Sequence, residues 1–191
     1  MMKQSLGGLW SLRRADEETV HEAQVPGSVY SALLADGTTP DPYYRENEFV
    51  YLELMDHDWV FSRGFEVTPE LLAQPRVLLN CQGLDTLAHV TVNGVHVADA
   101  DNMHITWCWD VKALLQPGMN TIEIAFDSPM RYVLAEDAKR PCWGSTDAVP
   151  GFSHLRKAHC MFGWDWGPRL PDCGIWREIE LLGVESRILT V

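Results

Sequence analysis

The chain has 191 residues, of which 46% are hydrophobic and 22% are charged, and its formal net charge is −12. This length and balance suit one globular domain over residues 1–191 with a sizeable core. The acidic excess argues against nucleic acid or a membrane surface as a partner, because both attract basic proteins.

The first residues contain no apolar run of the kind that signal peptides and membrane-spanning helices need. Five cysteines are widely spaced without a CxxC pair, and the seven histidines show no metal-binding spacing. We therefore expect a cytoplasmic protein with reduced thiols and without a metal or other cofactor.

The N-terminal part predicts a strand at residues 9–12 and a turn at 25–27. Ser28 can then cap a short helix, which Gly37 would end. Two prolines exclude regular structure at residues 40–44, so we expect a long loop that carries aromatic side chains.

From residue 57 the hydrophobic period becomes two, which is the spacing of a half-buried strand. This alternation predicts strands near residues 59–67, 77–81, 88–92, 95–97, 105–111 and 122–126. Asn93-Gly94 joins two of these strands and is a strong hairpin signal, because both turn residues need positive φ. A long polar loop is predicted at residues 128–150. Further strands are predicted at residues 154–161, 175–182 and 188–191.

Together these patterns give about eight or nine short strands, with turn signals every ten or so residues and one or two short helices. That spacing is typical of an all-β sandwich. Long connections between several of the strands favour a jelly roll over a simple meander.

The strongest chemical pattern is a pair of tryptophans, Trp164 and Trp166, on either side of Asp165. Gly163 and Gly167 bracket them, and such a loop can place all three side chains around one pocket. Aromatic faces pack on the C–H faces of sugars, and a carboxylate accepts hydrogen bonds from sugar hydroxyls. The spacing alone leaves open a second interpretation, a tryptophan-rich structural corner in which Asp165 caps a turn.

No hydrolytic pair can be located. Glycoside hydrolysis needs two carboxyl groups roughly 5–10 Å apart, and the abundance of acidic residues points to no such pair. Asn47-Glu48 has the form of the acid/base dipeptide of many retaining glycosidases, but it lies in a polar loop before the β pattern begins. We therefore expect Glu48 to be a solvated or capping residue, and we predict no catalytic residue in this chain.

The segment FGWDWGPRLPDCGIWR, residues 162–177, closely resembles the end of the N-terminal domain of family 2 β-mannosidases, glycoside hydrolases that remove terminal β-mannose. The resemblance covers most of the chain. It includes residues 25–30, 40–48, 57–63, 83–94 and 156–158.

The resemblance implies a galactose-binding-like jelly roll that precedes an immunoglobulin-like domain and a TIM barrel with both catalytic glutamates. Such a barrel alone takes about 250 residues, so it lies outside this chain. We therefore expect the N-terminal domain of a retaining exo-β-mannosidase, a piece of a longer polypeptide that is inactive alone.

The resemblance also implies site residues. Asp165 would hydrogen-bond hydroxyls of the terminal mannose, Trp164 and Trp166 would shape that pocket, and Arg156 would line or support it. The expected partners are a β-mannoside oligosaccharide and the remaining domains of the parent enzyme.

Three alternatives remain open. The chain can be a stand-alone carbohydrate-binding module, which would bind sugar unaided. It can be the equivalent domain of another family 2 glycosidase, such as a β-galactosidase or β-glucuronidase, although the Trp-Asp-Trp loop favours a β-mannosidase. A purely structural docking domain is the third.

Overall fold

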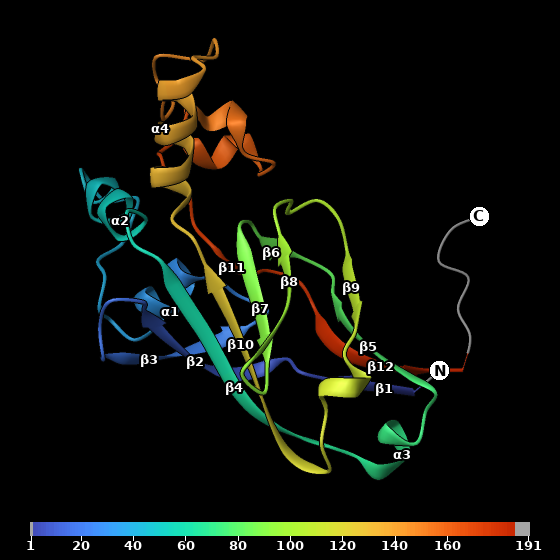
Figure 1. Cartoon of the computed structure of the whole chain (residues 1–191). Helices are drawn as coiled ribbons and strands as arrows, with labels where there is room; N and C mark the ends of the chain where they lie inside the picture. The colour runs from blue at the N-terminus through green and yellow to red at the C-terminus, as the bar shows by residue number, and fades with distance from the viewer. Residues whose placement is uncertain (1, 186–191) are drawn as a thin grey trace.

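The computed structural model describes residues 2–185 and contains two large antiparallel β-sheets, with α2 (Glu48–Leu54) and α4 (Pro129–Lys139) at one end and α3 (Pro69–Leu72) at the other (Figure 1). The predicted all-β sandwich is confirmed. The strand predicted at residues 188–191 lies outside the described residues.

The larger sheet has six strands in the order β3-β2-β4-β10-β7-β8. They are β2 (Gly8–Arg14), β3 (Val20–Val25), β4 (Trp59–Val67), β7 (Ala88–Val92), β8 (Val95–Ala100) and β10 (Gly118–Phe126). Central strands β4 and β10 pair along their whole length, from Trp59 opposite Phe126 to Val67 opposite Gly118. The alternation in the sequence therefore sets the register of the sheet.

The smaller sheet has four strands in the order β1-β12-β5-β9, and a two-stranded ribbon pairs β11 with β6. The bounds are β1 (Met2–Ser5), β5 (Arg76–Cys81), β6 (Leu84–Asp85), β9 (Trp107–Asp110), β11 (Gly174–Ile175) and β12 (Ile179–Val184). The strand predicted at residues 175–182 is thus divided between two sheets. The strand predicted at 105–111 is shorter than expected, and Ile105 is exposed.

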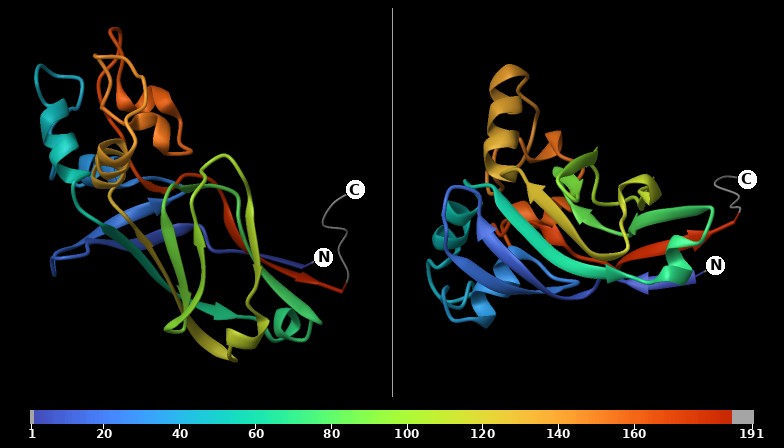
Figure 2. Two further views of the ribbon diagram at one scale, coloured as in Figure 1. Left: turned by 45° about the horizontal axis from the view of Figure 1, so that its top comes forward. Right: turned by 60° about the horizontal axis from the view of Figure 1, so that its bottom comes forward.

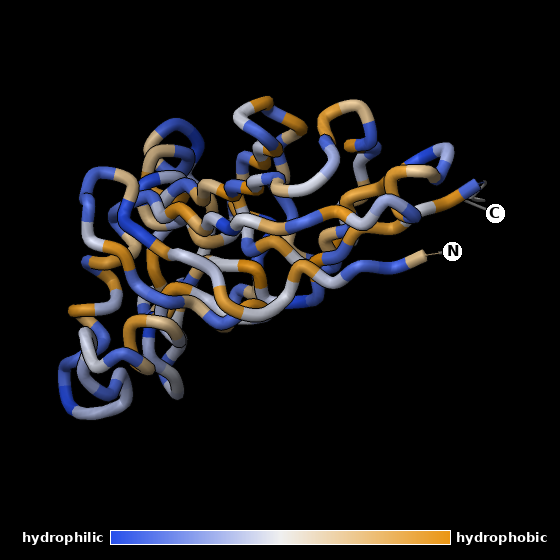
Figure 3. The backbone as a smooth tube through the Cα atoms, turned by 90° about the horizontal axis from the view of Figure 1, so that it is seen from below, coloured by the Kyte–Doolittle hydropathy of each residue, from blue (hydrophilic) through white to orange (hydrophobic). Residues whose placement is uncertain are grey.

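The inner faces of the two large sheets share one hydrophobic core. Phe61 of β4 and Phe126 of β10 meet edge to face, with ring centroids 5.6 Å apart. Leu79 of β5 and Leu181 of β12 belong to the same buried cluster. Seen from below, hydrophobic and hydrophilic residues are interspersed along the chain (Figure 3). Burial alternates along β10, which has one buried face, whereas every residue of β12 is buried.

Two predicted turn features are confirmed. Asn93 and Gly94 have φ values of 49° and 76° and close the β7–β8 hairpin. Ser28 caps α1 (Val29–Ala35) by accepting a hydrogen bond from the Ser31 amide, and Gly37 follows the helix with a φ of 79°.

The helical content exceeds the expectation of one or two short helices. Residues 2–185 contain four α-helices: α1, α2 (Glu48–Leu54), α3 (Pro69–Leu72) and α4 (Pro129–Lys139). They also contain three 3₁₀ turns: η1 (Lys112–Leu114), η2 (Phe152–His154) and η3 (His159–Phe162). Twelve strands lie in this range, above the expected number: β1, β3 and β6 have no counterpart among the predicted strands, and the strand predicted at residues 175–182 forms both β11 and β12.

The predicted polar loop over residues 128–150 is wrong, because its first half forms α4. Ser128 caps this helix by accepting a hydrogen bond from the Arg131 amide at 3.0 Å, and Pro129 stands at the first helical position. Val133 is fully buried and gives the helix an inner face.

The strand predicted at residues 154–161 is also wrong. This segment forms η2 and η3 with an irregular connection between them. Its apolar residue Leu155 packs with Phe162 against Val133 in a second, smaller core under α4. Leu155 and Phe162 thus pack against a helix and not against the face of a sheet.

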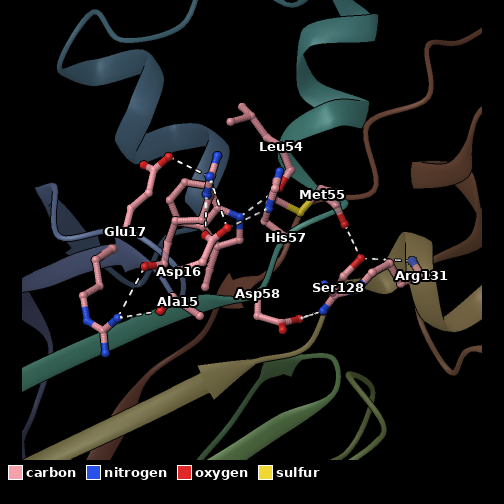
Figure 4. Close-up of polar contacts among 12 residues, drawn as sticks. Ala15, Asp16, Glu17, Leu54, Met55, His57, Asp58, Ser128 and Arg131 are labelled. Carbon is pink, nitrogen blue, oxygen red and sulfur yellow. Dashed lines mark hydrogen bonds and ion pairs between the residues drawn. The ribbon is translucent and has the colours of Figure 1, made fainter.

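The chain entering β4 and the chain leaving β10 are tied together (Figure 4). Asp58 accepts hydrogen bonds from the Ser128 amide, at 2.8 Å, and from the Arg131 guanidinium. The Ser128 hydroxyl donates to the carbonyl of Met55. These contacts fix α2 and α4 at the same end of the sandwich (Figure 2). Within residues 2–185, no helix is long and apolar enough to cross a membrane.

Candidate functional site

The Trp-Asp-Trp segment forms a tight turn at the helical end of the molecule. The Trp164 amide donates to the Gly167 carbonyl at 3.2 Å, and the Gly167 amide donates back to the Trp164 carbonyl at 3.3 Å. This pair of hydrogen bonds puts Asp165 and Trp166 at the tip. Gly163 precedes the turn with a φ of 89°, and a Cβ there would stand 2.4 Å from Cγ of Arg169.

The tip projects its side chains into solvent. The exposed fraction is 42% for Trp164 and 73% for Trp166, and Asp165 is exposed between them. Within residues 2–185 the Asp165 carboxylate makes no hydrogen bond or ion pair. The interpretation of a packed tryptophan corner in which Asp165 caps a turn therefore does not describe this loop.

The C-terminal side of the turn is anchored to α2. The Arg169 amide donates to Oε2 of Glu48 at 2.9 Å, and its guanidinium Nη2 donates to Oε1 at 2.6 Å. The same guanidinium lies 5.3 Å from the centre of the Phe49 ring. Burial acts to raise the pKa of Glu48, but the hydrogen bonds from Arg169 hold that pKa below its ordinary value.

The expectation that Glu48 is a solvated or capping residue is therefore wrong, because its carboxylate binds Arg169. It is the first residue of α2, and its carboxylate fixes the base of the Trp-Asp-Trp turn. Sequence reasoning missed this role, since Glu48 and Arg169 are 121 residues apart and no local pattern links them.

Arg156 holds its segment through the backbone. Its carbonyl accepts a hydrogen bond from the Met103 amide at 3.0 Å, and it pairs with Asn102 as an isolated bridge. The guanidinium is exposed, and among the described residues it makes no hydrogen bond or ion pair. The structure thus shows no hydrogen bond or ion pair between Arg156 and Asp165.

The next residue, Lys157, is fully buried and was not singled out from the sequence. Its ammonium group pairs with the Asp85 carboxylate of β6 and donates to the carbonyl of Asp172 at 2.6 Å. Thr86 adds a hydroxyl donor to Asp85. A buried charge needs such a set of partners, and this one joins the 156–158 segment to the chain that follows the turn.

Asp172 connects the segment after the Trp-Asp-Trp turn to α1. Its Oδ1 accepts hydrogen bonds from the Tyr30 amide, at 3.1 Å, and from the Cys173 amide, at 2.8 Å. Burial raises the pKa of Asp172 to about 6. The carboxylate therefore ties the end of the site loop to the first turn of α1.

A single carboxylate suits hydrogen bonding to a polar ligand but is not the pair of acids that glycoside hydrolysis uses. The loop offers one carboxylate, Asp165, between two exposed tryptophans in sequence. Within residues 2–185, no group of His, Cys, Asp or Glu side chains is arranged to hold a metal ion.

Comparison with known proteins shows the family to which the chain belongs. The family model described as glycosyl hydrolase 2 galactose-binding domain-like matches residues 10–177. The β-mannosidase of Capra hircus is 32% identical over 185 residues, which cover 93% of this chain and 21% of the goat protein.

Solved structures show the same relationship. The crystal structure of a β-D-mannosidase from Dictyoglomus thermophilum superimposes with a TM-score of 0.93 and 34% identity, covering 99% of this chain and 23% of that one. The exo-chitosanase CsxA of Amycolatopsis orientalis superimposes with a TM-score of 0.70 and 18% identity, covering 95% of this chain and 20% of that one, which shows a shared fold. The chain thus spans 21% to 23% of the length of the two β-mannosidases.

Proposed function

The chain belongs to the glycosyl hydrolase 2 galactose-binding-domain-like family, and we propose that it is the N-terminal domain of a retaining exo-β-mannosidase. In the parent enzyme it binds the terminal, non-reducing β-D-mannose through its Trp-Asp-Trp turn. Other domains of the same polypeptide supply the two carboxyl groups that cleave the bond.

One observation carries this proposal: Asp165 stands at the tip of an anchored turn and has no hydrogen-bond or ion-pair partner among residues 2–185. A carboxylate in that position accepts hydrogen bonds from two sugar hydroxyls. Each charged hydrogen bond contributes on the order of 1.5–3 kcal/mol once it is shielded from water. That contribution selects a hydroxyl pattern but breaks no covalent bond.

The shielding has to come from outside this chain. The turn is exposed here, and the related β-mannosidases are more than four times as long. We propose that the remaining domains close over the turn and complete the mannose subsite. The Glu48–Arg169 contact supports this arrangement, because a subsite assembled from two domains needs a rigid loop.

The two ligand-binding alternatives give different outcomes. A stand-alone carbohydrate-binding module binds sugar by itself, whereas half of a subsite shows no saturable binding of mannose or mannobiose at millimolar concentrations. Another family 2 glycosidase would prefer a different sugar. The 34% identity to a β-mannosidase, against 18% to an exo-chitosanase, favours mannose.

The test compares the parent polypeptide with residues 1–191 alone on a panel of chromogenic glycosides. The expected result is hydrolysis of the β-mannoside by the parent and none by the isolated chain. Preferential hydrolysis of a β-galactoside or β-glucuronide by the parent would reject the mannose assignment. Turnover that stays with the isolated chain through stringent purification would reject the division of roles.

A further inference from the structure

A groove lies beside the Trp-Asp-Trp turn, between that turn and the loop that leads into α2. Its volume of about 440 Å³ falls within the range of small-molecule sites. Its lining includes the apolar or aromatic residues Leu34, Tyr43, Met161, Trp166 and Leu170 and the acidic residue Asp172. Trp164 and Asp165 do not line it, so the groove meets the turn at Trp166 and Gly167.

Four aromatic residues line the groove, and two of them, Tyr43 and Trp166, are exposed and come from distant segments. Tyr43 is 76% exposed and Trp166 is 73% exposed, although each borders a largely apolar surface. Both segments stand at the same end of the molecule, where the cyan loop before α2 and the orange-red turn lie near each other (Figure 2). Exposed rings facing a shared groove are available to stack on a flat ligand.

The loop that carries Tyr43 is held in place by contacts that do not involve the Tyr43 ring. The Tyr43 amide donates to Oδ1 of Asp41 at 2.9 Å, and Nδ2 of Asn47 donates to the Asp41 carbonyl at 2.7 Å. The Tyr51 hydroxyl donates to the Pro40 carbonyl at 2.6 Å. The Tyr43 loop is therefore held by these hydrogen bonds, and the Trp-Asp-Trp turn is held by the Glu48–Arg169 contact, without a ligand.

The groove is not purely apolar. Asp172 lines it and is only 9% exposed, and its carboxylate is oriented by the amides of Tyr30 and Cys173. Ser28 and Ser31 also border the groove. Aromatic rings with a few fixed polar groups suit a pyranose better than a hydrocarbon chain or an anion.

We propose that this groove receives the sugar residue on the leaving-group side of the scissile bond, stacked between Tyr43 and Trp166. This inference rests on the proposed function, in which Asp165 holds the terminal mannose on the other side of the same turn. The preferred substrates are then β-manno-oligosaccharides, and a mannoside with a small aglycone leaves the groove empty.

The test uses the parent polypeptide with two substrates whose leaving groups are both alkoxides, β-1,4-mannobiose and methyl β-mannoside. Tyr43→Ala is expected to lower kcat/KM about tenfold on mannobiose, the effect of losing one aromatic contact. On methyl β-mannoside, which places no ring in the groove, kcat/KM should stay within about twofold of wild type.

Two further variants serve as controls. Tyr44→Ala removes a neighbouring tyrosine that is 57% exposed, lies outside the groove and contacts Arg45, and it should leave both substrates unaffected. Tyr43→Phe keeps the ring and should retain the preference for mannobiose. The melting temperature of each variant checks that the fold is intact.

The outcomes separate the two proposals. An equal loss on both substrates in Tyr43→Ala would mean that the groove is a contact with another domain, and the inference would be overturned. It would also be overturned by an unchanged Tyr43→Ala enzyme, or by a Tyr44→Ala enzyme with the same selective loss. Failure of the wild-type parent on both substrates would reject the proposed function itself.

Discussion

The carboxylate of Glu48 accepts two hydrogen bonds from Arg169, one from its amide at 2.9 Å and one from its guanidinium at 2.6 Å. This contact joins the start of α2 to the base of a turn whose tip carries Asp165. A loop that must present a carboxylate to a ligand loses less entropy on binding when it is already fixed.

Removing the Glu48 side chain should loosen the turn without unfolding the domain. In Glu48→Ala the Arg169 amide loses its acceptor, and its hydrogen exchange should become about tenfold faster, which corresponds to the net free energy of one such hydrogen bond. Exchange measured by NMR on residues 1–191 checks this expectation. Glu46→Ala, which removes an exposed acid two residues before α2, is the control. Unchanged protection of Arg169 in Glu48→Ala would show that the contact does not hold the turn.

Lys157 should contribute far more to stability than an exposed lysine. Lys157→Met leaves the buried Asp85 carboxylate without its cation, so the free energy of unfolding should fall by about 3–5 kcal/mol in urea titrations. Adding Asp85→Asn removes the unpaired charge and should recover part of that loss. Lys139→Met breaks an exposed pair with Glu136 and should leave the free energy of unfolding close to that of wild type. Equal effects of the two lysine substitutions would contradict a structural role for the buried pair.

Asp172 should make stability depend on pH in an unusual direction for a carboxylate. Its pKa is raised from an ordinary value of 3.8 to about 6, so the folded state keeps a proton that the unfolded chain has already released. Its contribution is therefore greatest at low pH and declines between about pH 4 and pH 6, by up to about 3 kcal/mol.

Asp172→Asn isolates this effect, because the amide oxygen can still accept hydrogen bonds from Tyr30 and Cys173 but does not titrate. The stability of the variant relative to wild type should rise by up to about 3 kcal/mol between about pH 4 and pH 7. A stability difference that stays constant across this range would show that Asp172 does not titrate there.

The sandwich could be predicted because its strands follow simple rules. The alternation around Phe61 and Phe126, the Asn93-Gly94 turn and the Ser28 cap each act over a few residues. The α4 helix was missed although Ser128-Pro129 is a recognisable helix start. The polar composition of the segment that follows favours a loop and obscures this helix start.

The site was only partly predictable. Glycines around the Trp-Asp-Trp sequence pointed to a turn, and the structure contains one. The Glu48–Arg169 anchor is a tertiary contact over 121 residues, which no local pattern specifies. The buried position of Lys157 also runs against expectation, since lysine is almost never fully buried without a partner, and its partner Asp85 lies in a distant strand.

The most direct test of the central claim is the kcat/KM of Asp165→Asn in the parent polypeptide on a β-mannoside. The substitution keeps the size of the side chain but removes the charge that strengthens its hydrogen bonds to hydroxyls. Asp56→Asn, an exposed acid at the end of α2, is the matched control. The account predicts that kcat/KM falls by at least about a hundredfold in Asp165→Asn, with an unchanged melting temperature and a normal control. Wild-type kinetics in a folded Asp165→Asn enzyme would contradict the claim that this carboxylate binds the terminal mannose.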